Sequence, residues 1–287
     1  MKVSGFSFVR NGIAYDYPFL ESIRSLLPLC DELVIAVGQS DDATFSSIQS
    51  LHSSKIVIIP TVWDDSLRSA GAVLAQQTNV ALERVTGDWA VYLQADEILH
   101  ENDLPEIRKA MQENIGNTRV EGLLFSYKHF YGSYEYVGSS RRWYRNEIRI
   151  VRPGTGVRSW GDAQGFRIGG RKLNVRPVAA CIYHYGWVRP PQVQQTRQRS
   201  FHRLWHSDEW VQRHVGSGSE FDYRNSGRLT RFTGTHPAVM RDRVKRQHWP
   251  FSYNPSLDKV RLKDWILDWF ESKTGFRIGE YRNYRIL

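Results

Sequence analysis

Short, almost wholly apolar segments alternate with helix-patterned segments through the first third of the chain. The apolar segments are residues 3–9, 32–37, 55–60 and 89–93. Between them, residues 17–29 and 70–85 carry apolar side chains at helical spacing. A strand that is apolar on both faces is typical of a parallel sheet covered by helices on each side. The pattern therefore predicts an α/β fold with a mostly parallel sheet flanked by helices.

Polar clusters follow the predicted strands at the point where each strand ends. They read RNG at 10–12, GQSDD at 38–42, WDD at 63–65 and QADE at 94–97. In open α/β sheets, ligands bind beyond the carboxyl ends of the strands. We therefore expect these clusters to converge on a binding site.

The pattern changes after residue 105. Shorter strands are predicted at 122–131, 147–151, 166–168 and 179–185, separated by glycines and basic turns. This spacing predicts a small antiparallel extension of the sheet. From residue 190 the chain becomes helical and basic, with a polar loop at 216–234 and an amphipathic helix at 262–270.

The charge balance indicates an anionic partner. The 287 residues include 39 Lys and Arg against 30 Asp and Glu, a net charge of +9. Such an excess favours nucleic acid, a membrane surface or a phosphate-bearing small molecule. No apolar run reaches the roughly 20 residues that span a bilayer, and residues 1–12 do not read as a signal peptide. Cys30 and Cys181, the only cysteines, stand far apart, so we expect a reducing, cytoplasmic environment.

Three segments carry a resemblance to a known family. VSGFSFVRNG near the N-terminus, then ELVIAVGQSDDAT, then ALERVTGDWAVYLQADEIL resemble family-2 glycosyltransferases of the GT-A fold, in the branch related to lipopolysaccharide-core and cell-wall glycosyltransferases. The resemblance covers roughly residues 1–190. It implies a GT-A type, Rossmann-like domain over 1–190, with a nucleotide-sugar half at 1–105 and an acceptor half at 106–190. Residues 191–287 would form a C-terminal helical extension.

The resemblance implies transfer of a sugar from a nucleotide diphosphate to an acceptor, usually with inversion and with a divalent metal, Mn²⁺ or Mg²⁺. Asp96 matches the metal-binding position of the family, and His184 resembles a late histidine that serves as a further metal ligand. Gln94 stands where the family triplet usually opens with Asp, and an amide cannot replace carboxylate charge. A helix-capping turn at 94–97 and a buried structural His184 are the alternative interpretations.

The same resemblance places nucleotide-sugar contacts at several positions. Ala36 stands where the second strand of the family usually ends in an Asp that contacts the nucleotide, so Asp41, Asp42, Asp64 or Asp65 would take over. Gln94 has the groups to hydrogen-bond a ribose or base. The expected donor-binding residues are Arg10, Asn11, Asp41, Asp42, Asp65, Asn79, Gln94 and Trp160. A plain turn at Arg10 and Asn11, or a surface position for Asn79, would leave these residues without that role.

Inverting transfer needs a general base that accepts the proton of the acceptor hydroxyl. Asp162 and Glu147 are the candidates. Asp162 is preferred because it lies in a glycine-flanked loop beside Trp160, which can stack on a sugar. Glu147 lies in an alternating strand, where a solvated face or an arginine pair is the simpler interpretation.

A basic stretch and a histidine pair complete the candidates. The stretch contains Arg141, Arg142, Arg145, Arg149 and Arg152, which can bind a diphosphate or an anionic acceptor. His202 and His206 have zinc-ligand spacing, but no third ligand is evident, so a helix surface is preferred.

The expected partners are a nucleotide-diphosphate sugar, a glycan, lipid-linked or other hydroxyl acceptor such as a surface polysaccharide or lipopolysaccharide, and peripheral contact with an anionic membrane at its inner face. No nucleic acid partner is expected. The alternatives are a nucleic-acid-binding α/β module and an inert relative that binds nucleotide only.

Overall fold

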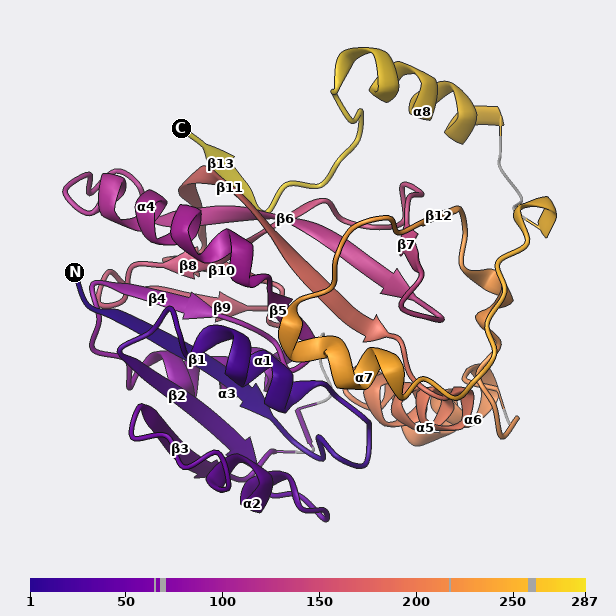
Figure 1. The fold of residues 1–287 in the computed structure, drawn as a ribbon, viewed down its shortest axis with the longest axis horizontal. Helices are drawn as coiled ribbons and strands as arrows, with labels where there is room; N and C mark the ends of the chain where they lie inside the picture. The colour runs from indigo at the N-terminus through magenta and orange to yellow at the C-terminus, as the bar shows by residue number, and fades with distance from the viewer. Residues whose placement is uncertain (65, 68–70, 217, 258–261) are drawn as a thin grey trace.

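The N-terminal strands form a parallel sheet, as the alternation of apolar segments predicts. The computed structural model describes residues 1–64, 66–67, 71–216, 218–257 and 262–287. The strands of this part are β1 (Val3–Val9), β2 (Glu32–Gly38), β3 (Ile56–Thr61) and β4 (Trp89–Tyr92). β1 pairs in parallel with β2 and β4, and β2 pairs in parallel with β3. Figure 1 shows them side by side at the indigo end of the chain.

Helices cover both faces of this sheet. They are α1 (Phe19–Leu26), α2 (Thr44–Gln49), α3 (Ala72–Leu82) and α4 (Leu104–Asn114). Val3 and Val9 pack into the same buried cluster as α1 and α4, whereas Phe6 packs into the cluster that contains the end of α3. Each strand therefore has apolar side chains on both faces because each face has its own core.

The second half extends the sheet to a mixed one. The added strands are β6 (Gly122–Tyr131), β8 (Asn146–Val151), β9 (Val157–Trp160), β10 (Gly165–Ile168) and β11 (Arg171–Trp187). The strand order is β3-β2-β1-β4-β8-β6-β11-β10-β9. β8 is antiparallel to both of its neighbours, and β9, β10 and β11 form an antiparallel meander.

The expected extension of short antiparallel strands is wrong in one respect. β11 is a single strand of 17 residues, and it pairs in parallel with β6. The sequence pattern predicted a strand only at 179–185. Pro177 lies inside β11, before that range. In the structure the register shifts between Pro177 and Cys181, and a bulge of this kind accommodates a residue that has no N–H to donate.

The remaining elements are short strands, helices and 3₁₀ turns. The short strands are β5 (Glu97–Leu99), β7 (Tyr136–Gly138), β12 (Leu229–Arg231) and β13 (Tyr284–Ile286). The later helices are α5 (Pro191–His202), α6 (Asp208–His214), α7 (Arg241–Lys245) and α8 (Leu262–Thr274). Short 3₁₀ turns are η1 (Glu101–Asp103), η2 (Tyr223–Asn225), η3 (Ala238–Met240) and η4 (Pro255–Leu257). Among the described residues, no helix has both the length and the apolar character for crossing a bilayer.

The C-terminal region contains helices, as expected, but it also returns to the sheet. β13 pairs in parallel with β11, so the chain ends beside the central strands (Figure 1). The division of the chain at residue 190 stays a prediction.

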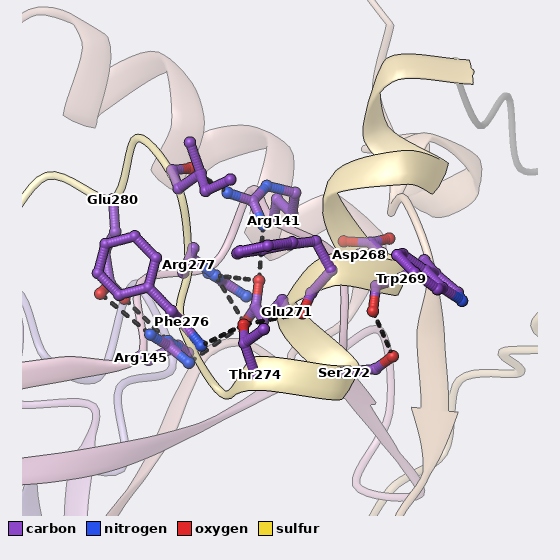
Figure 2. A network of polar contacts seen from close by, with 12 residues as sticks. Arg141, Arg145, Asp268, Trp269, Glu271, Ser272, Thr274, Phe276, Arg277 and Glu280 are labelled. Carbon is purple, nitrogen blue, oxygen red and sulfur yellow. Dashed lines mark hydrogen bonds and ion pairs between the residues drawn. The ribbon is translucent and has the colours of Figure 1, made fainter.

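Ion pairs tie α8 and the segment after it to the basic stretch. Glu271 receives hydrogen bonds from Arg141, Arg145 and Arg277, and Arg145 also donates to Glu280 (Figure 2). Elsewhere in the stretch, Arg149 pairs with Glu97, and Arg152 lies over the ring of Trp89 at 4.0 Å from its centroid. These four arginines of the stretch therefore have internal partners.

Candidate active site

A cavity of about 640 Å³ opens where the parallel strands end. All four polar clusters expected from the sequence contribute to its lining. β1 leads into Arg10 and Asn11, β2 into Asp41, β3 into Trp63, and β4 into Gln94 and Asp96. Later parts of the chain complete the wall, namely Tyr144, Asp162, Gln164, His184, Trp187, Arg197, Ser200 and Phe201. The structure therefore brings Arg10, Asn11, Asp41, Gln94, Asp96, Asp162 and His184 to one cavity.

Asp96 and His184 face each other inside this cavity. Asp96 Oδ1 lies 3.8 Å from His184 Nε2, and both residues are largely buried. The neighbouring Gly186 permits this approach. A Cβ on Gly186 would lie 2.6 Å from His184 Nε2 and 2.8 Å from Asp96 Oδ2. The backbone N–H of Tyr185 donates to the carbonyl of Asp96 at 2.8 Å, which fixes β11 against the end of β4.

A second histidine sets the tautomer of His184. His129 Nε2 lies 2.8 Å from the carbonyl oxygen of Tyr144, so it carries the proton and donates. Burial lowers the pKa of both histidines, so each ring is neutral near pH 7. His129 Nδ1 is then the acceptor for the N–H of His184 Nδ1, 3.0 Å away. His184 Nε2 is left with a lone pair directed toward the Asp96 carboxylate.

A lone pair facing a carboxylate is favourable only when a cation or a proton lies between them. A histidine that ligates a metal commonly donates its other ring N–H to a fixed partner, as His184 does. Within the described ranges, no group of three or more His, Cys, Asp or Glu side chains is placed to hold a metal ion. Asp96 and His184 by themselves could supply two ligands to a divalent cation, whose other ligands would be phosphate oxygens and water.

Glu97 points away from the cavity. Its carboxylate forms a bidentate ion pair with Arg149, and it also accepts from the hydroxyl of Tyr127. Neighbouring positions on an extended chain point to opposite sides, so only Asp96 of this pair faces the cavity.

Gln94 connects the end of β4 to the loop that carries Asp162. Its Nε2 donates to the carbonyl of Ala163 at 3.3 Å, and its backbone N–H donates to Glu97. Asp162 lies between Gly161 and Ala163, whose φ angles are +64° and +63°. Left-handed backbone is costly for alanine, and here the buried Ala163 is held in it beside an exposed Asp162.

Asp162 also lines a second cavity of about 440 Å³, which adjoins the first. Glu147, Trp160 and Tyr281 line only this second cavity, together with Arg141, Arg142, Arg145 and Arg277. Trp160 is 55% exposed, and the Arg167 guanidinium lies 4.8 Å from its ring centroid. Trp160, expected at the donor sugar, is therefore on the far side of Asp162 from the strand ends.

Glu147 has a different environment from Asp162. It is buried, and none of the described residues donates a hydrogen bond to its Oε2. Burial raises the pKa of Glu147 to about 8; nearby Arg149 opposes the shift, while Glu97 and Asp162 add to it. Glu147 therefore holds its proton at neutral pH.

Two expected donor-binding residues serve the backbone instead of lining the cavity. Asp42 accepts hydrogen bonds from the N–H groups of Ala14 and Thr44, and these bonds lower its pKa against the effect of burial. Asn79 exchanges hydrogen bonds with the backbone of Ser159 at 2.8 and 3.1 Å. Ala36 lies in the core. Asp65 lies outside the described residues.

The loops that follow β1 and β2 are held together by hydrogen bonds. Asn11, with φ of +52°, accepts from the backbone N–H of Asp41 at 2.9 Å. The guanidinium of Arg10 donates to the carbonyl of Gln39 and lies 5.4 Å from the centroid of the Trp63 ring. Trp63 thus forms part of the wall, although the sequence analysis named only its acidic neighbours.

Helix α5 contributes residues that the sequence analysis missed. Arg197 and Phe201 line the cavity with Tyr17, which precedes α1. The sequence signal for these cavity residues was the mixture of arginines and aromatic residues in the basic segment after residue 190. We assigned that segment to a C-terminal extension. His202 is the last residue of α5, and His206 lies beyond the helix, where it stacks on His202 and on Trp210. The preferred placement of both histidines on one helix surface is therefore wrong.

No protein-family model and no curated protein matches the chain. Solved structures of S. aureus TarS are similar to it at a low level. The complex with UDP-GlcNAc has a TM-score of 0.34 and 18% identity, over 45% of this chain and 35% of that one. Another TarS structure has a TM-score of 0.41 and 14% identity, over 70% and 39%. TarS 1–349 has a TM-score of 0.39 and 13% identity, over 74% and 68%. This chain thus spans well under half of the first two.

Proposed function

We propose that this protein is a glycosyltransferase that moves a sugar from a nucleotide diphosphate to a hydroxyl group of a glycan, lipid-linked or related acceptor, with inversion. One observation carries the proposal. A single cavity at the carboxyl ends of the parallel strands contains the Asp96–His184 pair, and Asp162 stands between it and a second cavity. The resemblance of the N-terminal segments to family-2 glycosyltransferases points to the same activity.

The donor would lie along the strand ends. Arg10, Asn11, Asp41 and Trp63 form the part of the wall next to β1, β2 and β3, which suits the nucleoside. Its diphosphate would then lie toward Asp96 and His184. These two side chains would hold Mn²⁺ or Mg²⁺, which when bound neutralises the charge of the leaving diphosphate. His129 accepts a hydrogen bond from the Nδ1–H of His184. This bond orients the His184 ring so that its Nε2 faces Asp96.

The acceptor would enter through the second cavity. Its exposed rings are Trp160 and Tyr281. Arg167 makes a cation–π contact with Trp160 and donates a hydrogen bond of 3.3 Å to the hydroxyl of Tyr281. Flat aromatic faces suit sugar rings, so an acceptor glycan is the substrate class that this wall favours. Asp162 adjoins both cavities and would take the proton of the acceptor hydroxyl as the new glycosidic bond forms.

Glu147 is the weaker candidate for this base. A carboxyl group that keeps its proton at neutral pH cannot accept another. It also lines only the second cavity. Asp162, exposed and held between two left-handed residues, is available at the junction.

Thermal unfolding tests the proposal. The full chain is heated with UDP, GDP, CDP, ADP or dTDP, each with Mn²⁺ and with EDTA. A nucleotide present at about 100 times its Kd stabilises the folded state by about 2.7 kcal/mol. We expect one of them to raise the melting temperature and its sugar conjugate to be consumed slowly by water. A protein that binds none of the nucleotides but binds DNA or RNA with a steep salt dependence would be the nucleic-acid-binding alternative.

Consumption of the sugar conjugate separates an active enzyme from an inert relative. The inert form would bind the nucleotide, yet leave its sugar conjugate intact even when acceptor glycans are present. Release of the nucleoside diphosphate, measured with a coupled phosphatase, decides between them.

A further inference from the structure

Arg189 is a buried cation without a hydrogen-bond partner. Its side chain is 0% exposed, and none of the described residues accepts a hydrogen bond from its Nε or either terminal nitrogen. Its guanidinium lies 4.8 Å from the centroid of the Tyr17 ring. A buried, unpaired charge costs several kcal/mol, and a cation–π contact returns only about 2 kcal/mol. Among the described residues, this buried charge therefore has a cation–π contact but no hydrogen-bond acceptor.

Arg197 brings this charge to the cavity. Its Nε donates to the hydroxyl of Tyr17 at 3.1 Å, and the residue lines the cavity wall. Its guanidinium also lies 4.6 Å from the ring centroid of Phe201. The aromatic neighbours fix the guanidinium plane, while the bond to Tyr17 uses Nε and leaves both terminal nitrogens for another acceptor.

The two arginines share their surroundings with Asp96. Burial lowers the pKa of Arg189, with Arg197 as the next cause, while the charge of Asp96 acts in the opposite direction at both residues. Both guanidinium groups stay protonated. Two cations against one carboxylate leave this end of the cavity positive with no metal ion bound.

We propose that Arg197, supported by Arg189, forms an anion subsite that holds the diphosphate of the donor without requiring a divalent cation. The inference rests on the proposed glycosyl transfer. A guanidinium group presents a planar fork that matches two phosphate oxygens. Gln94 supplies no carboxylate charge for binding a metal ion, and the fixed charge of Arg197 would neutralise the diphosphate in place of that ion. A cation bound by Asp96 and His184 would add to this neutralisation.

Inorganic pyrophosphate is the probe, because it has the same anionic groups and no base or sugar. Calorimetry on the full chain in EDTA should detect its binding. Arg197→Gln should weaken that binding roughly tenfold or more, as expected for loss of charged hydrogen bonds, whereas Arg197→Lys should retain part of it. Arg199→Gln is the matched control. Arg199 lies on the same helix and donates to the carbonyls of Gly216 and Gly218, outside the cavity.

Arg189→Met supplies a second measurement. Since none of the described residues accepts a hydrogen bond from the guanidinium, the apolar replacement should leave the melting temperature unchanged or higher while weakening pyrophosphate binding. A protein that binds a nucleoside diphosphate with Mn²⁺ but no pyrophosphate in EDTA would overturn the subsite and leave the glycosyl transfer standing. Equal pyrophosphate affinity in the wild type and Arg197→Gln would overturn it as well.

The binding mode separates two sources of the anion. If Arg197→Gln weakens binding of the nucleoside diphosphate but leaves the nucleoside alone unaffected, the subsite belongs to the donor. If it weakens pyrophosphate binding and leaves the nucleoside diphosphate at wild-type affinity, the subsite holds a phosphate of the acceptor, and the assignment to the donor is wrong.

The outward face of α8 carries a second, independent inference. Trp265, Ile266 and Trp269 are 59%, 50% and 55% exposed. The acidic side chains at Asp268 and Glu271 are turned toward the body of the protein, where they pair with arginines. Figure 2 shows Glu271 directed at Arg141 and Arg277, with Trp269 on the other side of the helix.

Lysines accompany these apolar side chains. Lys263 and Lys273 are exposed, so the outward face of α8 combines tryptophan with positive charge while the carboxylates of Asp268 and Glu271 are neutralised behind it. Tryptophan favours the headgroup region of a bilayer, and lysine is attracted to anionic lipids. We infer that this face docks on the surface of an anionic membrane.

Vesicle co-sedimentation tests the docking. Phosphatidylcholine vesicles that contain phosphatidylglycerol should bind the full chain at low salt, whereas pure phosphatidylcholine should bind it weakly. The double variant Trp265→Ser with Trp269→Ser should lose this binding, and Trp160→Ser, which removes a tryptophan of similar exposure elsewhere, should keep it. Undiminished binding of the double variant would contradict the inference. A second outcome would also contradict the inference: the wild type forms a dimer in sedimentation velocity, the double variant does not, and neither binds vesicles. The face would then join two copies of the chain.

Discussion

Glu97 and Arg149 form a bidentate ion pair that is fully enclosed by the protein. The two nitrogen–oxygen distances are 2.8 Å each, and both side chains are 0% exposed. Glu97 is the residue after Asp96, so the pair determines which way this short segment faces. With Glu97 held inward by Arg149, Asp96 is directed to the cavity.

Breaking this pair should destabilise the fold. We expect Arg149→Met to lower the free energy of unfolding by about 3–5 kcal/mol, because it leaves a buried carboxylate without its partner. Urea denaturation monitored by tryptophan fluorescence measures the change. The double variant Glu97→Leu with Arg149→Met should recover much of the loss. A single variant as stable as the wild type would contradict the buried pair.

Asp96→Asn should remove the charge that attracts a divalent cation while keeping the shape of the side chain. We expect transfer to fall a hundredfold or more, which corresponds to roughly 3 kcal/mol of transition-state stabilisation. Turnover is measured with the active nucleotide sugar, and circular dichroism checks the fold. Full activity in a folded Asp96→Asn protein would rule out the metal-binding role.

His129→Phe should weaken metal binding without touching the metal site directly. The Nδ1 atom of His129 accepts a hydrogen bond of 3.0 Å from the Nδ1–H of His184. Loss of such a hydrogen-bond partner typically costs 10–100-fold in metal affinity. Titration with Mn²⁺, followed by electron paramagnetic resonance of the unbound ion, gives the affinity. His202→Phe serves as the control, because it replaces a histidine that stacks on His206, away from Asp96 and His184. Equal Mn²⁺ affinity in both variants would show that His129 does not orient the ligand.

Asp162→Asn should abolish transfer and leave donor affinity nearly intact. The lost group acts on the acceptor proton in the transition state and contributes little to ground-state binding. Calorimetry gives donor affinity, and a transfer assay gives the rate, for Asp162→Asn beside Glu147→Gln. If Glu147→Gln binds donor but cannot transfer, and Asp162→Asn is active, Glu147 is the base.

Glu147 should make stability fall as the pH rises. Its folded-state pKa is about 8 against an ordinary value of 4.5, so the folded state binds the extra proton between these values. Stability is then greatest below the ordinary pKa and is lost up to about pH 8. Glu147→Gln keeps a neutral side chain, so its advantage over the wild type should grow from pH 5 to pH 8, measured by urea unfolding. A gap that does not change with pH would mean that Glu147 is ionised throughout.

Much of the N-terminal fold could be predicted because its strands have a local signature. The predicted strand at 3–9 coincides with β1, and the predicted strand at 122–131 coincides with β6. Both are apolar runs bounded by turn residues, so the sequence pattern of each strand agrees with the burial of its side chains. The predicted strand at 179–185 covers only part of β11, because the pairing of the earlier residues with β6 depends on a strand that is distant in the sequence.

The candidate site was predictable to the extent that it follows the strand ends. Arg10, Asn11, Asp41, Gln94 and Asp96 reach the cavity because the carboxyl ends of parallel strands meet at one edge of the sheet. Arg197 was missed because the segment after residue 190 was assigned to a C-terminal extension, although α5 follows β11 almost directly. Its place in the wall depends on packing across the molecule.

By itself the sequence determined the alternation of strands and helices, the edge of the sheet where polar groups gather, and the positive charge of the whole chain. These properties follow from local period, turn chemistry and composition. Only the tertiary structure decided what each polar group does there. It assigned Asn79 to the backbone of Ser159, enclosed Glu147 so that its pKa rises, and placed Arg189 beside Tyr17 with no hydrogen-bond acceptor among the described residues. The charge state and the partners of a side chain depend on residues distant in the chain, and folding alone brings these together.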